Sequence, residues 1–182
     1  MAEFTDLEPA AWYHDGVHYV LEAGIMNGTG SGKFEPNATT SRAMIVTMLW
    51  RMEGEPETSG ALTFTDVPED TWYTEAVRWA SSQGIVNGYS ANQFGPADSV
   101  TREQIATILY RYAQSKGQGF TGTWMFLLDY PDASEVSSWA DEAMHWMDMQ
   151  EIINGMDGRL NPRGEATRAQ VATMLMRYEA QS

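Results

Sequence analysis

The sequence contains no cysteine and few basic residues, and each shortage excludes a class of protein. Without cysteine, neither a disulfide nor thiol chemistry is available. Eleven Lys and Arg residues stand against 25 Asp and Glu, so the 182-residue chain has a formal net charge of −14. Nucleic acids and anionic membrane surfaces both attract basic protein surfaces. We therefore expect no nucleic-acid partner and no polybasic membrane anchor.

Long apolar runs are also missing. No stretch approaches the roughly 18 apolar residues of a membrane-spanning helix, so we expect no membrane insertion. The opening MAEFTDLEP has neither the basic nor the apolar region of a signal peptide. If the protein is exported, we expect its signal to lie outside this sequence or to have been removed. Hydrophobic residues still make up 43% of the chain, which is enough for a packed core.

The chain repeats itself. Shifting it by about 60 residues aligns FTDLEPAAWY with FTDVPEDTWY, and the match continues without a gap to Arg51. A third copy begins near Tyr130 and needs a one-residue adjustment. The copies occupy residues 1–52, 53–112 and 113–182, where the second and third include linkers. Because one copy has too little core to be stable, we expect a single cooperative domain. The linker at 113–129 is rich in large apolar residues and is expected to pack against the body.

Each copy predicts a helix, a loop and a second helix. The stretch WYTEAVRWASSQG has apolar residues at helical spacing and ends at a glycine. The loop NGYSANQFGP contains a proline that blocks helix continuation. The second helices begin at hydroxyl residues suited to N-capping: Ser41, Thr101 and Thr167. Three such units packed around a pseudo-threefold axis predict an all-α fold.

The repeated motifs resemble those of the S-layer homology domain family of bacterial cell-surface proteins. In three copies, the chain has a Phe-x-Asp opening with Trp-Tyr, a Gly-Ile-x-Asn-Gly loop, Phe-x-Pro and a Thr-Arg-Ala-Glu-like helix start, with some substitutions. The resemblance implies a three-pronged spindle around a central helical bundle. It also implies non-covalent attachment of a larger surface protein to secondary cell-wall polysaccharide, often one with pyruvylated amino sugars. The implied location is the bacterial cell wall or S-layer, and the implied activity is binding without catalysis.

The chain departs from the family pattern at several positions. The fourth residue of the helix-start motif is Met44, Gln104 or Gln170 instead of glutamate. Glutamine can complete a capping box three residues after the N-cap, whereas methionine is not expected to. In the third copy, Glu151 and Leu160 replace a glycine and a phenylalanine. We therefore expect three unequal grooves, with Gln104 and Gln170 near the ligand.

Arg42, Arg102 and Arg168 occupy the first position of the three second helices. A cation there faces the positive end of the helix dipole, at a cost of about 0.3–1 kcal/mol. One explanation is a salt bridge to Asp6, Asp66 or Asp132. The other is capture of an anion by the guanidinium and the free helix N–H groups. The resemblance implies that these arginines contact an acidic sugar in grooves between copies, so we expect them to serve binding more than stability.

Other candidate residues belong to the same implied grooves. The loop glycines are Gly28, Gly88 and Gly155. Trp79 and Trp146 occupy one aligned position on the first helices, and could stack on sugar rings or pack in the core. For the aligned Trp12, Trp72 and Trp139, packing is the favoured interpretation.

The sequence also bears on two other functional classes. The alternative to a glycan anchor is a protein-interaction or adhesion module. An enzyme is not expected, because neither a paired acid and base nor a nucleophile constellation stands out. No cofactor or metal is expected either. His14 and His18 have zinc-ligand spacing, but the other copies do not repeat it.

Overall fold

The computed structural model describes residues 4–181, and its regular structure is helical. No strand is named within that range, where pairing is limited to isolated β-bridges. The all-α class predicted from the sequence is therefore confirmed. The elements are α1 (His14–Glu22), α2 (Arg42–Met52), α3 (Thr74–Ser82), α4 (Arg102–Ser115), the short 3-10 helix η1 (Ala133–Glu135), α5 (Asp141–Met149) and α6 (Arg168–Glu179).

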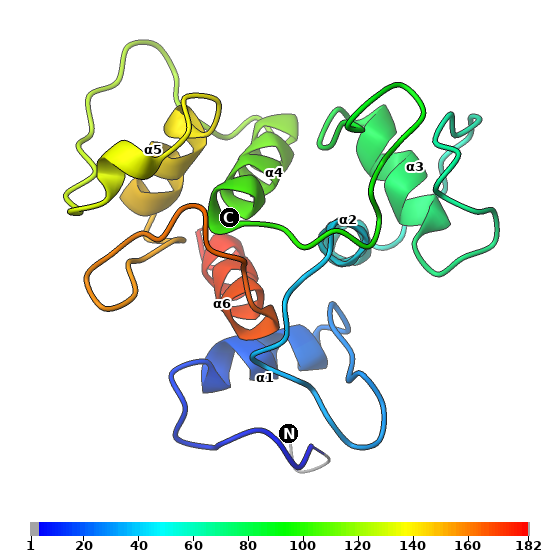
Figure 1. Ribbon diagram of the computed structural model, residues 1–182, viewed down its shortest axis with the longest axis horizontal. Coiled ribbons are helices and arrows are strands. Elements are labelled where there is room, and N and C mark those ends of the chain that lie inside the picture. Colours follow the sequence, from blue (N-terminus) through cyan, green and yellow to red (C-terminus); the bar gives the residue numbers. More distant parts are fainter. Residues whose placement is uncertain (1–3, 182) are drawn as a thin grey trace.

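The helices pair between copies of the repeat. Helix α3 packs on α2, α5 packs on α4, and α1 packs on α6. The first helix of each copy thus covers the second helix of the preceding copy, and the first copy closes onto the third. Figure 1 shows the three pairs arranged around a common centre, with α2, α4 and α6 innermost. The sequence did not predict that helices pair between copies. Each copy contains both a first and a second helix, and the sequence does not show which first helix packs on which second helix.

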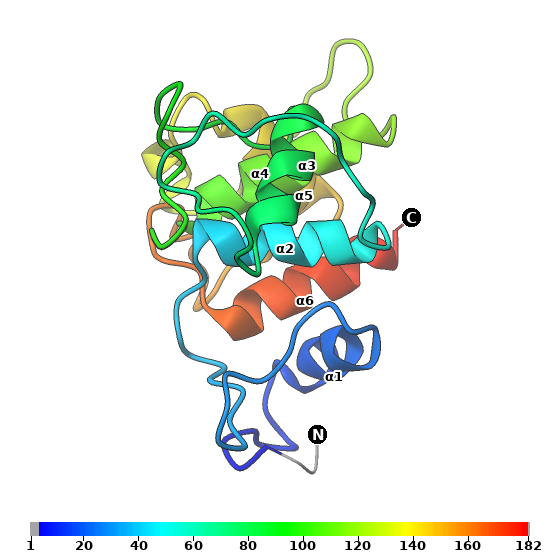
Figure 2. The same ribbon diagram turned by 90° about the vertical axis from the view of Figure 1, so that its right-hand side faces the viewer.

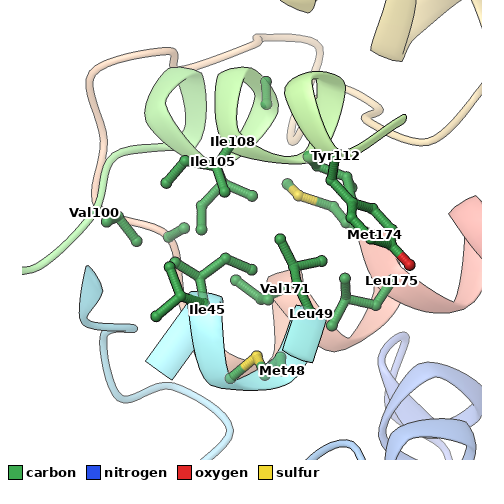
Figure 3. Packing of buried hydrophobic residues seen from close by; sticks show 14 of the residues in the cluster. Ile45, Met48, Leu49, Val100, Ile105, Ile108, Tyr112, Val171, Met174 and Leu175 are labelled. Carbon is green, nitrogen blue, oxygen red and sulfur yellow. The ribbon is translucent and has the colours of Figure 1, made fainter. Parts of the chain in front are cut away.

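The core lies where the three second helices meet. Ile45, Ile105 and Val171 come from α2, α4 and α6 and point into one shared space (Figure 3). Their side chains are at most 1% exposed. Burying such a side chain contributes about 1.5–3 kcal/mol, and truncating one to alanine costs about 2–5 kcal/mol. Each copy supplies one side of this space, so residues of all three copies form the core.

A ring of backbone hydrogen bonds joins the copies just before the second helices. Thr40 N–H donates to the Ala166 carbonyl, Ala166 N–H to the Val100 carbonyl, and Val100 N–H to the Thr40 carbonyl, each at 2.9 Å. All three residues are fully buried. The donors and acceptors form a closed circle, which fixes how the N-terminal ends of α2, α4 and α6 meet. Figure 2 shows α2 and α6 lying side by side in this central layer.

The apolar linker packs only in part against the body. Leu128 is buried at 6% exposure, and Trp124 lies between Phe120 and His145, with ring centroids at 4.2 and 5.0 Å. Met125 and Leu127 are 96% and 80% exposed. The prediction that this linker packs against the body is therefore confirmed for Trp124 and Leu128 and wrong for Met125 and Leu127.

Candidate ligand-binding grooves

Three grooves occupy equivalent positions along the central helices but differ in size and lining, and each uses all three copies. One copy supplies a loop and its second helix, the next copy supplies a tryptophan, and the preceding copy supplies an arginine. We name each groove by its helix. The α2 groove of about 410 Å³ combines loop 25–29 with Trp72 and Arg168. The α4 groove of about 230 Å³ combines loop 86–89 with Trp139 and Arg42, and the α6 groove of about 400 Å³ combines loop 152–157 with Trp12 and Arg102.

The groove tryptophans are exposed. Trp12, Trp72 and Trp139 have 61%, 58% and 57% of their surface accessible. The packing interpretation of these residues is therefore wrong. In the first two copies the neighbouring tyrosine packs edge-on against the indole, as Tyr13 does against Trp12 and Tyr73 against Trp72, with centroids at 5.5 and 4.9 Å. An indole held in this way presents a flat apolar surface to the groove.

Trp79 and Trp146 lie elsewhere. They are 6% and 5% exposed and pack against Tyr112 and Tyr110, with ring centroids at 6.4 and 5.2 Å. Neither lines any of the three grooves. The structure therefore removes both from the candidate ligand contacts, and their burial agrees with the packing interpretation. Both indoles pack against α4, which is the second helix of Trp79's own copy and of the copy that precedes Trp146.

The arginines that begin the second helices are buried and bound to the protein. Arg42, Arg102 and Arg168 are 8%, 2% and 5% exposed. Each donates to two carbonyl groups in the loop of the next copy, and Arg168 closes the circle onto the first copy. The acceptors are Phe94 and Asn87 for Arg42 (2.8 and 2.7 Å), Leu160 and Asn154 for Arg102 (2.7 and 3.0 Å), and Phe34 and Asn27 for Arg168 (2.9 and 2.7 Å).

These bonds change the interpretation of the three arginines. Burial lowers the pKa of each guanidinium, while nearby acidic groups, such as Asp132 beside Arg102, oppose that shift. An arginine that ties two copies together contributes to stability. We expected these residues to serve binding more than stability because we placed them at the surface, and that placement is wrong. Their charge still borders the grooves, since each guanidinium is part of a groove wall.

Salt bridges from the three arginines to the opening aspartates, which were one explanation for the arginines, do not form among residues 4–181. The Asp6 carboxylate instead accepts hydrogen bonds from Phe34 N–H and Glu35 N–H, at 2.9 and 2.8 Å. Asp66 and Asp132 hold the equivalent loops in the same way. Burial on its own would raise the pKa of each carboxyl, but the backbone hydrogen bonds outweigh burial and lower it. The aspartates therefore shape the loops whose carbonyls receive the arginines.

Free helix N–H groups are not available for an anion. Arg42 N–H and Ala43 N–H donate to the Asp98 and Pro96 carbonyls of the next copy, at 2.9 and 3.0 Å. The third N–H, that of Met44, donates to the N-cap Ser41 hydroxyl at 3.2 Å. The same pattern recurs at α4 and α6. The explanation that the guanidinium and free helix N–H groups capture an anion together is therefore wrong in its second part, since these N–H groups already have acceptors.

The capping boxes differ in strength. Gln104 accepts a hydrogen bond from Thr101 N–H at 2.9 Å, and Gln170 accepts one from Thr167 N–H at 3.3 Å. Met44 was not expected to cap, but its sulfur takes the same place, 3.5 Å from Ser41 N. A thioether is a weak acceptor. All three side chains also line their own groove, so capping and groove position are properties of one residue.

A second row of arginines reaches the grooves from the other end of the helices. Arg51, Arg111 and Arg177 line the α2, α4 and α6 grooves. Arg51 donates to the Ile25 carbonyl at 3.1 Å, and Arg177 to the Ile152 carbonyl at 3.5 Å. The sequence analysis gave these arginines no role. The signal was present, because each of the three second helices carries an arginine at this position.

The loop glycines line the grooves and need to be glycine for packing. A Cβ atom on Gly88 would lie 2.5 Å from the Phe64 ring and 2.6 Å from the Gln93 carbonyl oxygen. On Gly155 it would lie 2.5 Å from the Tyr130 ring, and on Gly28 it would clash in the same way with the Phe4 ring. These positions therefore let the opening aromatic residue of each copy support the groove loop.

The exposed indole, the guanidinium and the amide groups of a groove together suit a ligand that has an apolar ring face and a carboxylate. Aromatic faces pack on the apolar faces of sugar rings, and arginine recognises carboxylates with paired N–H donors.

Among residues 4–181, no group of three or more His, Asp or Glu side chains is placed to hold a metal ion. No helix in that range is long and apolar enough to cross a membrane.

Comparison with known proteins gives matches over nearly the whole chain. A family model of the S-layer homology domain matches three times, at residues 3–43, 63–106 and 129–172. The surface-layer 125 kDa protein of Lysinibacillus sphaericus is 30% identical over 181 residues, which is 97% of this chain and 15% of that protein. A cellulosome-anchoring protein of Acetivibrio thermocellus is 28% identical over 105 residues, covering 56% of this chain and 24% of that protein.

Some similar proteins are enzymes, and the match covers a small part of them. An amylopullulanase of Thermoanaerobacterium thermosulfurigenes is 28% identical over 177 residues, which is 94% of this chain and 9% of the enzyme. The chain thus spans between 9% and 24% of the length of these three relatives. The three matches of the family model coincide with the three copies found by internal comparison.

Proposed function

Because the chain belongs to the S-layer homology domain family, which places it at the bacterial cell wall or S-layer, we propose that its three grooves bind secondary cell-wall polysaccharide. The chain is then a non-catalytic module that anchors a larger surface protein without a covalent bond. The observation that carries this proposal is the threefold recurrence of a groove with an exposed tryptophan beside an arginine. The expected ligand is an acidic polymer, with pyruvylated amino sugars as the candidate units.

The net charge supports recognition by local contacts. A protein with a formal charge of −14 repels an anionic polymer at long range, so binding depends on short-range contacts inside the grooves. We therefore propose that Arg51, Arg111 and Arg177 contribute charge, that Trp12, Trp72 and Trp139 contribute ring faces, and that Gln104 and Gln170 line the site. The glycines Gly28, Gly88 and Gly155 shape the loops.

The shape and cohesion of the molecule are part of the same proposal. Every groove draws on all three copies, so we propose one cooperative domain with the three-pronged spindle form, in which residues 1–60 alone do not fold. A sharp thermal transition for that isolated fragment would contradict this cooperative behaviour.

A pull-down with purified, protein-free wall polysaccharide tests the function. We expect binding by the native protein and at least a tenfold loss when Trp12, Trp72 and Trp139 are all changed to alanine. The matched control is Trp124→Ala, which removes an indole outside the grooves and should bind normally. Retention only by walls that still carry protein would instead support the protein-interaction or adhesion alternative.

A further inference from the structure

Each groove loop contains an Asn-Gly pair, and the structure leaves these pairs open to a covalent change. The pairs are Asn27-Gly28, Asn87-Gly88 and Asn154-Gly155. We propose that the first two are sites of deamidation assisted by the protein itself, and that the third is restrained. Three features carry this inference: the accessibility of the asparagine amides, a cation on the asparagine backbone carbonyl, and the state of the glycine N–H.

The reaction joins two atoms of neighbouring residues. The glycine nitrogen loses its proton to a solvent base and attacks the side-chain carbon Cγ of the asparagine. A new N–Cγ bond forms, the bond between Cγ and the side-chain nitrogen breaks, and ammonia leaves, so the product is a cyclic succinimide. Water then opens the ring at either carbonyl carbon and gives aspartate or isoaspartate. Glycine favours the closure because it has no Cβ to obstruct the attacking nitrogen.

The three asparagine side chains are free to make this closure. All three residues are exposed, and within residues 4–181 their side-chain amides make no hydrogen bond. By contrast, the Asn92 side-chain oxygen accepts from the Ser90 hydroxyl at 2.9 Å, and Gln93 follows it in place of glycine. Closure within one residue pair needs no encounter between molecules, so an unrestrained side chain is already close to its target.

A buried guanidinium lies where the reaction develops negative charge. When the glycine nitrogen loses its proton, the charge is shared with the carbonyl oxygen of the same peptide, which is the asparagine backbone oxygen. A fixed donor aimed at a developing oxyanion lowers the barrier to forming it, and a charged donor is stronger than a neutral one. In each loop that oxygen accepts from an arginine: Arg168 at Asn27 (2.7 Å), Arg42 at Asn87 (2.7 Å) and Arg102 at Asn154 (3.0 Å).

The glycine N–H distinguishes the third copy. Gly155 N–H donates to the Tyr130 hydroxyl at 3.3 Å, whereas the N–H groups of Gly28 and Gly88 have no acceptor within residues 4–181. This hydrogen bond must break before the nitrogen can attack. The first two copies have phenylalanine at the position aligned with Tyr130, so they lack the hydroxyl.

Both products change the loop that joins two copies. Each adds a negative charge to a groove wall, because Asn27, Asn87 and Asn154 line the grooves. Isoaspartate also routes the main chain through the former side chain, which lengthens the loop and shifts the carbonyls that receive the arginine. We therefore expect the modified protein to unfold at a lower urea concentration than the native protein.

Mass spectrometry of the full chain tests the inference site by site. The protein is incubated at mildly alkaline pH in water enriched in heavy oxygen, so that products formed during the incubation carry the label. Parallel samples remain folded in buffer or unfolded in urea. In urea we expect three similar rates, because an apolar residue precedes each asparagine. In the folded protein, Asn27 and Asn87 should react at least as fast as in urea, and Asn154 about threefold to tenfold more slowly than either.

Exchanging one hydroxyl provides matched variants. Tyr130→Phe removes the acceptor of Gly155 N–H and installs the residue of the other copies, so we expect Asn154 to react about threefold to tenfold faster. Phe64→Tyr should slow the reaction of Asn87 by a similar factor. Asn87→Gln is the control, because its longer side chain closes the ring more slowly. Thermal melting verifies that each variant is folded.

Each contrary outcome has a distinct meaning. If all three asparagines react more slowly in the folded protein than in urea, the assistance by the arginines is overturned. If Tyr130→Phe leaves the rate at Asn154 unchanged, the restraint by the hydroxyl is overturned. If the modified fraction, separated by ion exchange, is as stable as the native protein, the effect on the joined copies is overturned while the sites stand. None of these readouts depends on the proposed glycan binding.

Discussion

The N-terminal and C-terminal ends of the central helices carry the same residue type in opposite environments. Arg102 begins α4, is 2% exposed and donates to two carbonyls of the third copy. Arg111, nine positions later on the same helix, is exposed and unengaged within the described chain. A buried guanidinium must find acceptors inside the protein, so the first row of arginines is committed to assembly. In the second row, Arg51 and Arg177 donate to carbonyls of their own copy, and Arg111 has no partner among residues 4–181.

The difference shows that repetition alone does not identify a binding residue. Both rows recur in all three copies, and the first lies inside the family's signature motif. The structure separates them by burial and by acceptors: the N-terminal row is buried and donates to carbonyls of the neighbouring copy. The C-terminal row is half-buried or exposed, and its carbonyl acceptors among residues 4–181 belong to its own copy. The following predictions test this contrast, beginning with the largest effect.

Removing the buried charge should cost the most stability. Arg102→Met leaves the Leu160 and Asn154 carbonyls without their donor, so we expect the free energy of unfolding to fall by about 3–5 kcal/mol. The matched control is Arg111→Met, the same substitution at the other end of α4, with an expected change within about 0.5 kcal/mol. Urea unfolding measures both, and equal stabilities would refute the division of roles.

The loop that receives Arg102 depends on a carboxylate, which gives a pH-dependent test. The two carboxylate oxygens of Asp132 accept from Leu160 N–H and Asn161 N–H, and Asp132→Asn replaces one of these oxygens with an amide nitrogen. We expect the free energy of unfolding to fall by about 2 kcal/mol at pH 7. Because the pKa of the Asp132 carboxyl is lowered in the folded state, its stabilisation is present above about pH 4 and is lost as the pH falls through that lowered pKa.

The two proteins should therefore converge in acid. Thermal melting between pH 7 and pH 2 measures this, with the exposed Asp129→Asn as the control that leaves the loop intact. If the difference in melting temperature between the native protein and Asp132→Asn stays constant down to pH 2, the carboxylate is not what holds the loop.

The N-terminal end also contains one unsatisfied group. The Thr40 hydroxyl is buried and has no hydrogen-bond partner among residues 4–181, and the aligned residues in the bonded ring are Val100 and Ala166. Thr40→Val replaces the hydroxyl with a methyl group, so we expect a gain of about 1 kcal/mol. Thr47→Val is the control, because the Thr47 hydroxyl donates to the Ala43 carbonyl at 2.8 Å. Removing a hydroxyl that has a partner should not stabilise the protein. A loss of stability in Thr40→Val would contradict the account.

Differences within the C-terminal row should be the smallest. Arg51 has a carbonyl partner and a weak ion pair, whereas Arg111 has neither in the described chain. We expect Arg51→Gln to lose about 0.5 kcal/mol and Arg111→Gln to lose less. Denaturant titrations of both variants at low and high salt measure the difference, and a larger loss in Arg111→Gln would mean that it is tied down after all.

Much of the fold follows from local pattern, and much of the site does not. The capping residues Ser41, Thr101 and Thr167 begin the second helices as predicted, because N-capping depends only on neighbours along the chain. Trp12 and Trp79 show the limit. Both are tryptophans near the first helix in their copies, yet one is exposed in a groove and the other is buried. Their environments depend on which copy packs beside them.

The sequence by itself determined three copies, helices with correct caps, an acidic surface and the family to which the chain belongs. These properties are set by residue types at short spacing, which act before distant segments meet. Only the tertiary structure decided that α1 covers α6, that Arg168 donates to the Asn27 carbonyl, and that every groove is shared by three copies. Arg168 and Asn27 are distant in sequence, and their contact arises because a ring of three units closes only when the last one binds the first.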